Sequence, residues 1–214
     1  MRKLYVHQLP IRIWHWINAI GCVLLVLTGI QIRYVGLIDV LPFRTAVIYH
    51  DWIGAIIVGN FFVWLLSYMF SVRIRVYHPE LDPIELFRGC VRQAIYYSYG
   101  IFKGAPNPFH LSRTRKFNPL QSLTYQIVML LLLPIQCFTG ILLWDLSRFS
   151  RVVDMLGGVR VVDTVHVGIF IIFVFYIPFH AYLGTLGRTP LEHYKAMFTG
   201  YEEVPEDQEA EKSA

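Results

Sequence analysis

Long apolar stretches alternate with polar segments along the chain, and four of these stretches approach the roughly 20 residues that a helix needs to cross a bilayer. They cover residues of about 13–32, 46–70, 120–144 and 165–187. Four spans place both termini on the same side of the membrane. We therefore expect an all-α membrane protein, a four-transmembrane-helix bundle that residues 1–200 form as one domain.

The polar segment 71–119, between the second and third apolar stretches, carries a helical pattern of its own. Arg88 and Arg92 fall between apolar residues that recur at three-to-four spacing, namely Ile84, Phe87, Val91, Ile95 and Phe102. This pattern predicts a helix that lies in the membrane interface. A solvated loop helix is the alternative, and the nearby tyrosines at 96, 97 and 99 favour the interface.

Basic residues concentrate near the N-terminus and in segment 71–119, whereas acidic and basic residues balance in the two other loops. Basic loops tend to stay in the cytoplasm, so we place both termini and segment 71–119 on the cytoplasmic side. The final residues, 201–214, are acidic, and we expect them to form a disordered tail.

The composition agrees with a membrane protein, because 55% of the 214 residues are hydrophobic and the mean hydropathy is +0.47. The pI near 9.0 could suggest a nucleic-acid partner, but basic cytoplasmic loops explain the same excess, so we expect none. The three cysteines are scattered, and the sequence has no CxxC or CxxCH motif. This argues against an iron–sulfur cluster, a thiolate zinc site and a covalently attached haem in this chain.

Four of the eight histidines lie at the ends of the apolar stretches. His166 and His180 are fourteen residues apart, so a helix places them on one face, roughly 21 Å apart along its axis. With the topology above, His15 and His180 lie at the cytoplasmic depth, whereas His50 and His166 lie at the outer depth. Depth therefore predicts two pairs, His15 with His180 and His50 with His166.

Two histidines at one depth on facing helices can fill both axial positions of a haem iron. The pattern predicts two haem groups in the bundle core, which would transfer electrons and not bind oxygen. An interhelical hydrogen bond is the ordinary explanation for one intramembrane histidine, but it accounts poorly for four at two depths. The remaining histidines are expected to be solvated: His7, His78, His110 and His193.

Several other residues fit this arrangement, each with an ordinary alternative. Gly29 lies fourteen residues after His15, where a missing side chain would let the outer haem approach, although close helix packing would explain it equally well. Arg12, Arg44 and Arg160 are candidate partners of haem propionates near the membrane surfaces. Interfacial snorkelling explains the same arginines equally well.

At these residues the sequence resembles the b-type cytochrome subunits of membrane-bound nickel–iron hydrogenases. That family is related to the gamma subunits of formate dehydrogenase, the thiosulfate reductase cytochromes b and bacterial cytochrome b561. The matching pieces are LPIRIWHW at 9–16, His50, KFNPLQ at 116–121, HVG…FHAY at 166–182 and MFTGY at 197–201. The resemblance covers nearly the whole chain and implies two b haems in a bacterial or archaeal cytoplasmic membrane, with both termini cytoplasmic.

The resemblance also implies a quinone site beside the inner haem, for menaquinone or ubiquinone. Asn118 matches a quinone-contacting asparagine of the formate dehydrogenase relatives, and Gln121 lies one turn later. From the residues alone, both could equally cap the helix of the third span. On the outer face, the resemblance implies iron–sulfur or multihaem oxidoreductase subunits as partners.

Together these features predict a dihaem subunit that carries electrons between an outer redox partner and the quinone pool. It would be an electron-transfer subunit, with at most a quinone-reactive site of its own. One alternative is a stand-alone b561-type quinone oxidoreductase, and another is a membrane subunit for a multihaem cytochrome, formate dehydrogenase or thiosulfate reductase. A transporter or assembly protein is a third. Transporters usually show paired repeats or acidic residues within spans, but no repeat is apparent here and Asp51, beside His50, is the one acidic residue in the apolar stretches.

Overall fold

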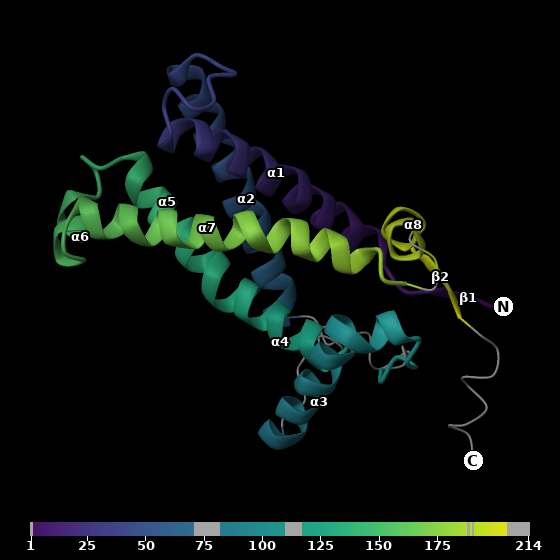
Figure 1. Cartoon of the computed structure of the whole chain (residues 1–214). Coiled ribbons are helices and arrows are strands. Elements are labelled where there is room, and N and C mark those ends of the chain that lie inside the picture. The colour runs from purple at the N-terminus through teal and green to yellow at the C-terminus, as the bar shows by residue number, and fades with distance from the viewer. Residues whose placement is uncertain (1, 71–81, 110–116, 188, 190, 205–214) are drawn as a thin grey trace. The chain divides into compact units, whose positions relative to one another are not determined.

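The computed structural model describes residues 2–70, 82–109, 117–187, 189 and 191–204. The chain forms two compact units, one of Met1–Trp64 with Gln136–Ala214 and one of Leu65–Ile135. Among the described residues, the segments long and apolar enough to cross a membrane are Leu9–Arg33, Phe43–Phe70, Pro119–Trp144 and Val159–Gly184. The four expected spans are therefore present (Figure 1).

The first two spans are the single helices α1 (Leu9–Arg33) and α2 (Phe43–Phe70). α1 begins before the apolar stretch because Pro10 stands in its first turn, where a missing amide hydrogen costs little. Along these helices, apolar side chains such as Leu27 and Trp52 are more than half exposed, at 56% and 70%. Such outward apolar surface suits contact with lipid hydrocarbon.

The third span combines α4 (Pro119–Ile127), the π-helical turn η4 (Val128–Leu132) and α5 (Leu133–Trp144). Pro134 explains the wide turn, because it has no amide hydrogen and its ring crowds the carbonyl four residues earlier. The widened turn keeps the span continuous through the proline.

The fourth span is α7 (Val159–Gly184), which begins earlier than the apolar pattern predicted. Gly157 and Gly158, with φ of 97° and 93°, turn the chain directly before its first residue. His166 consequently lies inside the helix, roughly 10 Å along the axis from Val159, and not at its start.

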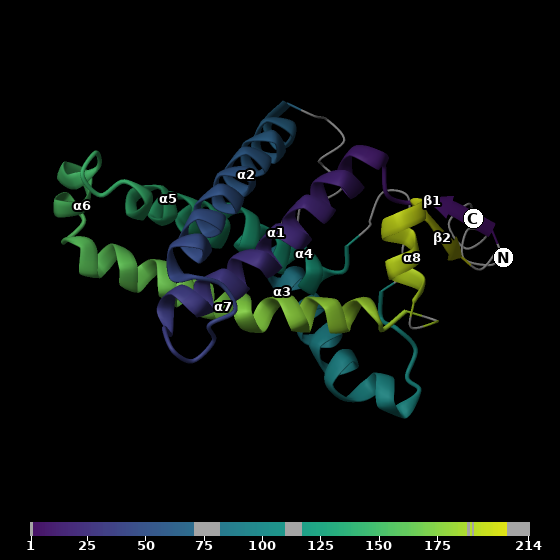
Figure 2. The same cartoon turned by 90° about the horizontal axis from the view of Figure 1, so that it is seen from above.

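The connection before α7 contains a short helix, α6 (Ser150–Met155), that the sequence pattern did not predict. Leu142, Val153 and Val162 are each 2% exposed and form a small core between α5, α6 and α7. α6 and the C-terminal helix α8 (Glu192–Thr199) lie at opposite ends of α7 (Figures 1 and 2).

A two-stranded antiparallel sheet joins the beginning of the chain to its C-terminal part. β1 (Arg2–Tyr5) pairs with β2 (Tyr201–Val204), with Tyr5 opposite Tyr201. The expectation of a disordered tail from residue 201 onward is therefore wrong for Tyr201–Val204. The partner strand lies at the other end of the sequence, so the acidic composition of the tail could not reveal it. Residues 205–214 lie outside the described residues.

The second unit contains the expected helix of segment 71–119, α3 (Pro83–Ile95), followed by η2 (Tyr96–Gly100) and η3 (Ile101–Lys103). Asp82 caps α3, because its carboxylate accepts hydrogen bonds from the amides of Ile84 and Glu85. The loop residues 71–81 and 110–116, with His78 and His110, lie outside the described residues.

α3 buries its small and polar face and exposes its apolar face. Gln93 is 1% exposed, and a Cβ atom added to Gly89 would lie 2.7 Å from the ring of Pro119. The exposed apolar residues of this segment are Ile84, Phe87, Val91, Ile95 and Phe102. This face suits the predicted contact with the membrane interface, which stays a prediction.

Candidate haem-binding site

The first unit brings four histidines of three spans together as two pairs. The ring centres of His15 on α1 and His180 on α7 are 6.2 Å apart, with 47° between the ring planes. Those of His50 on α2 and His166 on α7 are 6.4 Å apart, with 71° between the planes. The pairs that depth predicted from the sequence thus lie side by side in the structure.

The His50 ring is hydrogen-bonded to Thr28 of α1, 2.9 Å from Nδ1 to Oγ1. The single hydroxyl hydrogen of Thr28 is already donated to the carbonyl of Leu24, at 2.8 Å. The hydroxyl therefore accepts from His50, which places the ring proton on Nδ1. This tautomer leaves a lone pair on Nε2 of His50.

The His166 ring is held in the same way by α5. Thr139 lies 2.9 Å from Nδ1 of His166 and donates its hydroxyl hydrogen to the carbonyl of Gln136, at 3.1 Å. The side-chain amide of Gln136 also lies 3.3 Å from Nε2 of His166, so that it can donate to the lone pair there. Both rings of the His50–His166 pair therefore carry their proton on Nδ1 and a lone pair on Nε2, and at His166 that lone pair lies within reach of the Gln136 amide.

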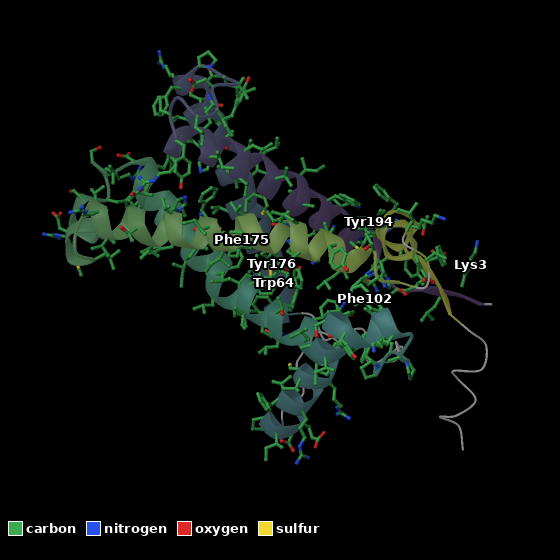
Figure 3. All side chains as sticks on the ribbon, in the orientation of Figure 1. Lys3, Trp64, Phe102, Phe175, Tyr176 and Tyr194 are labelled. Atoms are coloured by element: carbon green, nitrogen blue, oxygen red, sulfur yellow. The ribbon has the colours of Figure 1, made fainter. Side chains whose placement is uncertain are left out.

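The His15–His180 pair has aromatic neighbours instead. Tyr176 stacks on the His180 ring, with centres 5.6 Å apart and 22° between the planes, and Trp16 packs edge-on against His15. Figure 3 labels Tyr176 on α7. Nδ1 of His15 is buried and has no hydrogen-bond partner among the described residues. The two pairs therefore share their spacing but differ in their hydrogen bonding.

The N-terminal part of α1 is fixed by the C-terminal part of the chain. The indole nitrogen of Trp16 donates to the carbonyl of Met197 at 3.1 Å, and the Trp16 ring stacks on Phe198 with centres 4.5 Å apart. The Arg12 guanidinium donates to the carbonyl of Phe198. Two motifs from opposite ends of the sequence, 9–16 and 197–201, thus contact each other, and we call this the terminal contact.

The candidate propionate partners have different surroundings. Arg12 lies in the terminal contact, and its Nε atom is buried without a hydrogen-bond partner in the described part of the chain. Arg44 and Arg160 are exposed at the first turns of α2 and α7. Arg33 instead forms an ion pair with Asp163, 3.6 Å apart, which links the end of α1 to α7 near His166.

Asn118 and Gln121, in the second unit, form a capping box at the start of α4. The side-chain oxygen of Asn118 accepts from the backbone amide of Gln121 at 2.8 Å, and the side-chain oxygen of Gln121 accepts from the backbone amide of Asn118 at 3.1 Å. The side-chain nitrogen of Asn118 donates to the Tyr97 hydroxyl at 3.1 Å. The capping role that the sequence left open is therefore present.

His193, which was expected to be solvated, has an acidic partner. Its Nδ1 atom lies 3.4 Å from a carboxylate oxygen of Glu202 on β2. The hydrogen bond to Glu202 raises the pKa of His193, against the opposing effect of burial. This contact ties α8 to the β1–β2 sheet.

Comparison with known proteins identifies the family. A family model described as prokaryotic cytochrome b561 matches residues 6–200. The chain belongs to the prokaryotic cytochrome b561 family. A curated protein of Escherichia coli (strain K12), named "Putative cytochrome YdhU", is 32% identical over 202 residues, which are 93% of this chain and 74% of that protein. No solved structure matches the chain.

As a cytochrome b561-type protein, the chain is a multi-pass prokaryotic membrane protein that transfers electrons and binds haem b. The histidine pairs fit that cofactor. A metal–imidazole bond is about 2 Å long. When the distance from each bonded nitrogen to the centre of its ring is added, the centres of two rings bonded to one metal lie about 6 Å apart. The measured separations of 6.2 and 6.4 Å agree with this value.

The remaining donors and the space near the rings fit haem as well. The described residues contain no group of three or more His, Cys, Asp or Glu side chains able to hold a metal ion, whereas haem iron needs few protein ligands. A Cβ atom added to Gly54, one turn after His50, would meet no atom within 4 Å, so there is open space near His50, whereas one added to Gly140 would lie 3.2 Å from Cε1 of His166. At Gly29 an added Cβ would lie 3.5 Å from Cε1 of His50.

Sequence reasoning missed the polar residues that orient the histidines, namely Thr28, Thr139 and Gln136. The available signal was a polar residue within an apolar span. For threonine this signal is weak, because its hydroxyl can donate a hydrogen bond to a carbonyl of the preceding turn and then needs no partner on another helix.

Proposed function

We propose that this cytochrome carries electrons across the membrane through two b haems. His50 and His166 would be the axial ligands of one haem, and His15 and His180 those of the other. Haem b supplies a one-electron centre at its iron. With two histidines to hold each iron, no position would remain for oxygen, which favours electron transfer over oxygen chemistry.

The observation that carries this proposal is the presence of two imidazole pairs with matching separations, 6.2 and 6.4 Å. For the His50–His166 pair, the hydrogen bonds with Thr28 and Thr139 also place a lone pair on each Nε2 atom, which is what a ferric or ferrous iron requires. At His166, a bond to iron would replace the contact of Nε2 with the Gln136 amide. Interhelical hydrogen bonding alone would not require two pairs with the same spacing.

We further propose that the two haems connect an outer redox partner to the quinone pool. His50 and His166 belong to the end of the spans near the acid-balanced loops, and His15 and His180 to the end near the basic segments. The charge distribution supports a cytoplasmic position for the His15–His180 end. A quinone reduced there would take two electrons from the haems, one at a time, and two protons from the cytoplasm.

The role of Asn118 in quinone binding can be separated from its capping role by one substitution. Asn118→Asp keeps an oxygen that caps α4 but removes the amide hydrogens that a quinone carbonyl could accept. If Asn118 contacts quinone, N118D folds normally, binds both haems and loses quinol-dependent haem reduction. If quinone turnover is unchanged in N118D, Asn118 is only a cap.

The central test is a reduced-minus-oxidised absorption spectrum of the purified protein, with haem content measured per chain. Wild type should contain two b haems. His166→Ala and His15→Ala should each lose about one haem, because each removes a ligand of a different pair. His193→Ala is the matched control, since His193 contacts Glu202 and belongs to neither pair.

The proposal fails if the purified protein contains no b haem, or if His193→Ala lowers the haem content as much as His166→Ala does. Mass spectrometry of copurifying subunits tests the outer partner. Stable purification of the chain alone with quinone activity would favour the stand-alone oxidoreductase over the partner-dependent subunit.

A further inference from the structure

We propose that Thr28 and Thr139 are positioning residues that make the haem of His50 and His166 the more reducing of the two. This inference rests on the proposed function, because it assigns a role to the hydrogen bonds of two proposed haem ligands. It concerns the relative potentials of the haems, which the ligand assignment alone does not determine.

One arrangement of protons satisfies both neighbours of each threonine, because a carbonyl oxygen can only accept. Each threonine hydroxyl has one hydrogen, and Thr28 donates it to the carbonyl of Leu24 while Thr139 donates it to that of Gln136. Each hydroxyl can therefore only accept from the histidine at 2.9 Å. In this arrangement both threonines accept the Nδ1 proton of a ring, and the lone pair of that ring lies on Nε2.

A hydrogen bond that withdraws the Nδ1 proton makes the opposite nitrogen a stronger electron donor. A stronger donor stabilises the ferric state more than the ferrous state, because the ferric iron carries the higher charge. The reduction potential of that haem falls as a result. Both ligands of the His50–His166 pair receive this effect, so the two contributions act in the same direction.

Within the part of the chain that the structure describes, no hydroxyl group is hydrogen-bonded to either ring of the His15–His180 pair. Nδ1 of His15 has no hydrogen-bond partner among the described residues, and His180 stacks on Tyr176. The cationic side chain of Arg12 also lies three residues before His15 on α1, and a nearby positive charge opposes the ferric state. Both differences raise the potential of this haem relative to the other.

Two acidic residues lie near the His50–His166 pair. Asp51 follows His50 on α2, and its negative charge would lower the potential in the same direction as the threonines, so the test must change the hydroxyls while Asp51 stays in place. Asp163 lies one turn before His166, but Arg33 pairs with it at 3.6 Å, so their charges largely cancel. Thr28 and Thr139 are 8% and 5% exposed, so water does not readily replace their hydroxyls. The buried hydroxyls are therefore the main polar contacts by which the two pairs differ.

The test is a redox titration of the protein in lipid nanodiscs, in which absorption spectra report the oxidation state of each haem. Thr28→Val and Thr139→Val remove the acceptor while keeping the side-chain shape. The double variant should raise the midpoint potential of one haem by up to 59 mV. At a fixed applied potential, this corresponds to a tenfold change in the ratio of oxidised to reduced haem. The other haem should not shift.

Two further variants serve as controls. Thr28→Ser keeps a hydroxyl that can accept the hydrogen bond and should leave the potential at the wild-type value. Thr185→Val removes a hydroxyl that donates to the carbonyl of Tyr182 and contacts neither pair, so it should shift neither haem. Repeating Thr28→Val in a variant that retains only the haem of His50 and His166 assigns the shifted component.

The inference is overturned if both haems bind in the Thr→Val variants and neither potential rises, or if both rise equally. It is also overturned if Thr28→Ser shifts the potential as much as Thr28→Val does. These outcomes differ from failure of the proposed function, which would appear as missing haem in the wild-type protein before any titration.

Discussion

The two histidine pairs have almost the same spacing, but the chain positions them by different means. At the His50–His166 pair, hydroxyl groups from α1 and α5 bind the rings directly. At the His15–His180 pair, the terminal contact instead fixes the helix that carries His15, through Trp16 and Arg12. One pair is oriented ring by ring, whereas the other depends on the placement of a helix end.

This difference predicts that the two pairs respond to different substitutions. If each pair holds a haem, side-chain changes at Thr28 or Thr139 should alter the properties of one haem with little effect on helix packing. Changes in the terminal contact alter the stability of the other haem site without touching a ligand. The following substitutions test this separation.

The largest effect is expected for Trp16→Ala, which removes both the stacking on Phe198 and the hydrogen bond to Met197. We expect a loss of about 3 kcal/mol of stability and weaker retention of the haem at His15 and His180. Thermal unfolding and haem absorbance in detergent measure the two effects. Trp52→Ala, at a site 70% exposed on α2, should change both little.

If Trp16→Ala instead releases both haems to the same extent, the two pairs are not positioned independently. Trp16→Phe refines the result, because it keeps an aromatic ring against Phe198 and loses only the hydrogen bond. That variant should lose about 1 kcal/mol.

A smaller effect is expected for Gly200→Ala, between α8 and β2. Gly200 has a φ of 88°, and an added Cβ would lie 2.6 Å from the Tyr5 ring and 2.8 Å from the carbonyl oxygen of His7. We expect about 2 kcal/mol of destabilisation from backbone strain and this clash together. Gly36→Ala is the control, because Gly36 has a φ of 86° with no atom within 4 Å of the added Cβ.

Gly36→Ala should cost about 1 kcal/mol, from backbone strain alone. Equal losses for the two variants, measured by thermal unfolding, would show that contact with the N-terminal segment contributes nothing at Gly200. A larger loss at Gly200 measures the packing of the C-terminal part against Tyr5 and His7.

The smallest effect concerns pH. Because Glu202 raises the pKa of His193 in the folded protein, protonated His193 stabilises the contact between α8 and β2. This stabilisation is fully present below the unfolded pKa of about 6.5 and is lost as the pH rises through the raised folded pKa. Both partners are partly exposed, so we expect less than about 1 kcal/mol.

Thermal unfolding between pH 5 and 9 measures this dependence, and Glu202→Gln should flatten it. The haem spectrum at the His50–His166 pair should stay constant over the same range. A pH dependence that persists in Glu202→Gln would assign it to another group.

The spans and the histidine pairing could be predicted from the sequence, because both depend only on positions along the chain. Apolar length predicts a span, and the position of a histidine within a span gives its depth. α3 was predicted from its periodic apolar residues, and the structure adds that its opposite face buries Gly89 and Gln93.

The contacts that position the rings could not be predicted in the same way. Thr28 and Thr139 look like ordinary span residues, because threonine hydroxyls can bind the backbone of their own helix. The terminal contact and the β1–β2 sheet join residues from opposite ends of the chain, and neither segment is apolar enough to reveal a partner. For Asn118, one residue type is compatible with a helix cap and with a quinone contact, so the sequence left both roles open. The structure shows the cap.

The terminal contact also has a consequence for biosynthesis. His15 leaves the ribosome early, yet Met197 and Phe198, which fix its helix, are made only after nearly the whole chain has been translated. His50, by contrast, can meet the Thr28 hydroxyl as soon as the first two helices have been inserted into the membrane. Cofactor loading at His15 and His180 is therefore expected to be the last step in maturation, and the step most sensitive to interrupted synthesis.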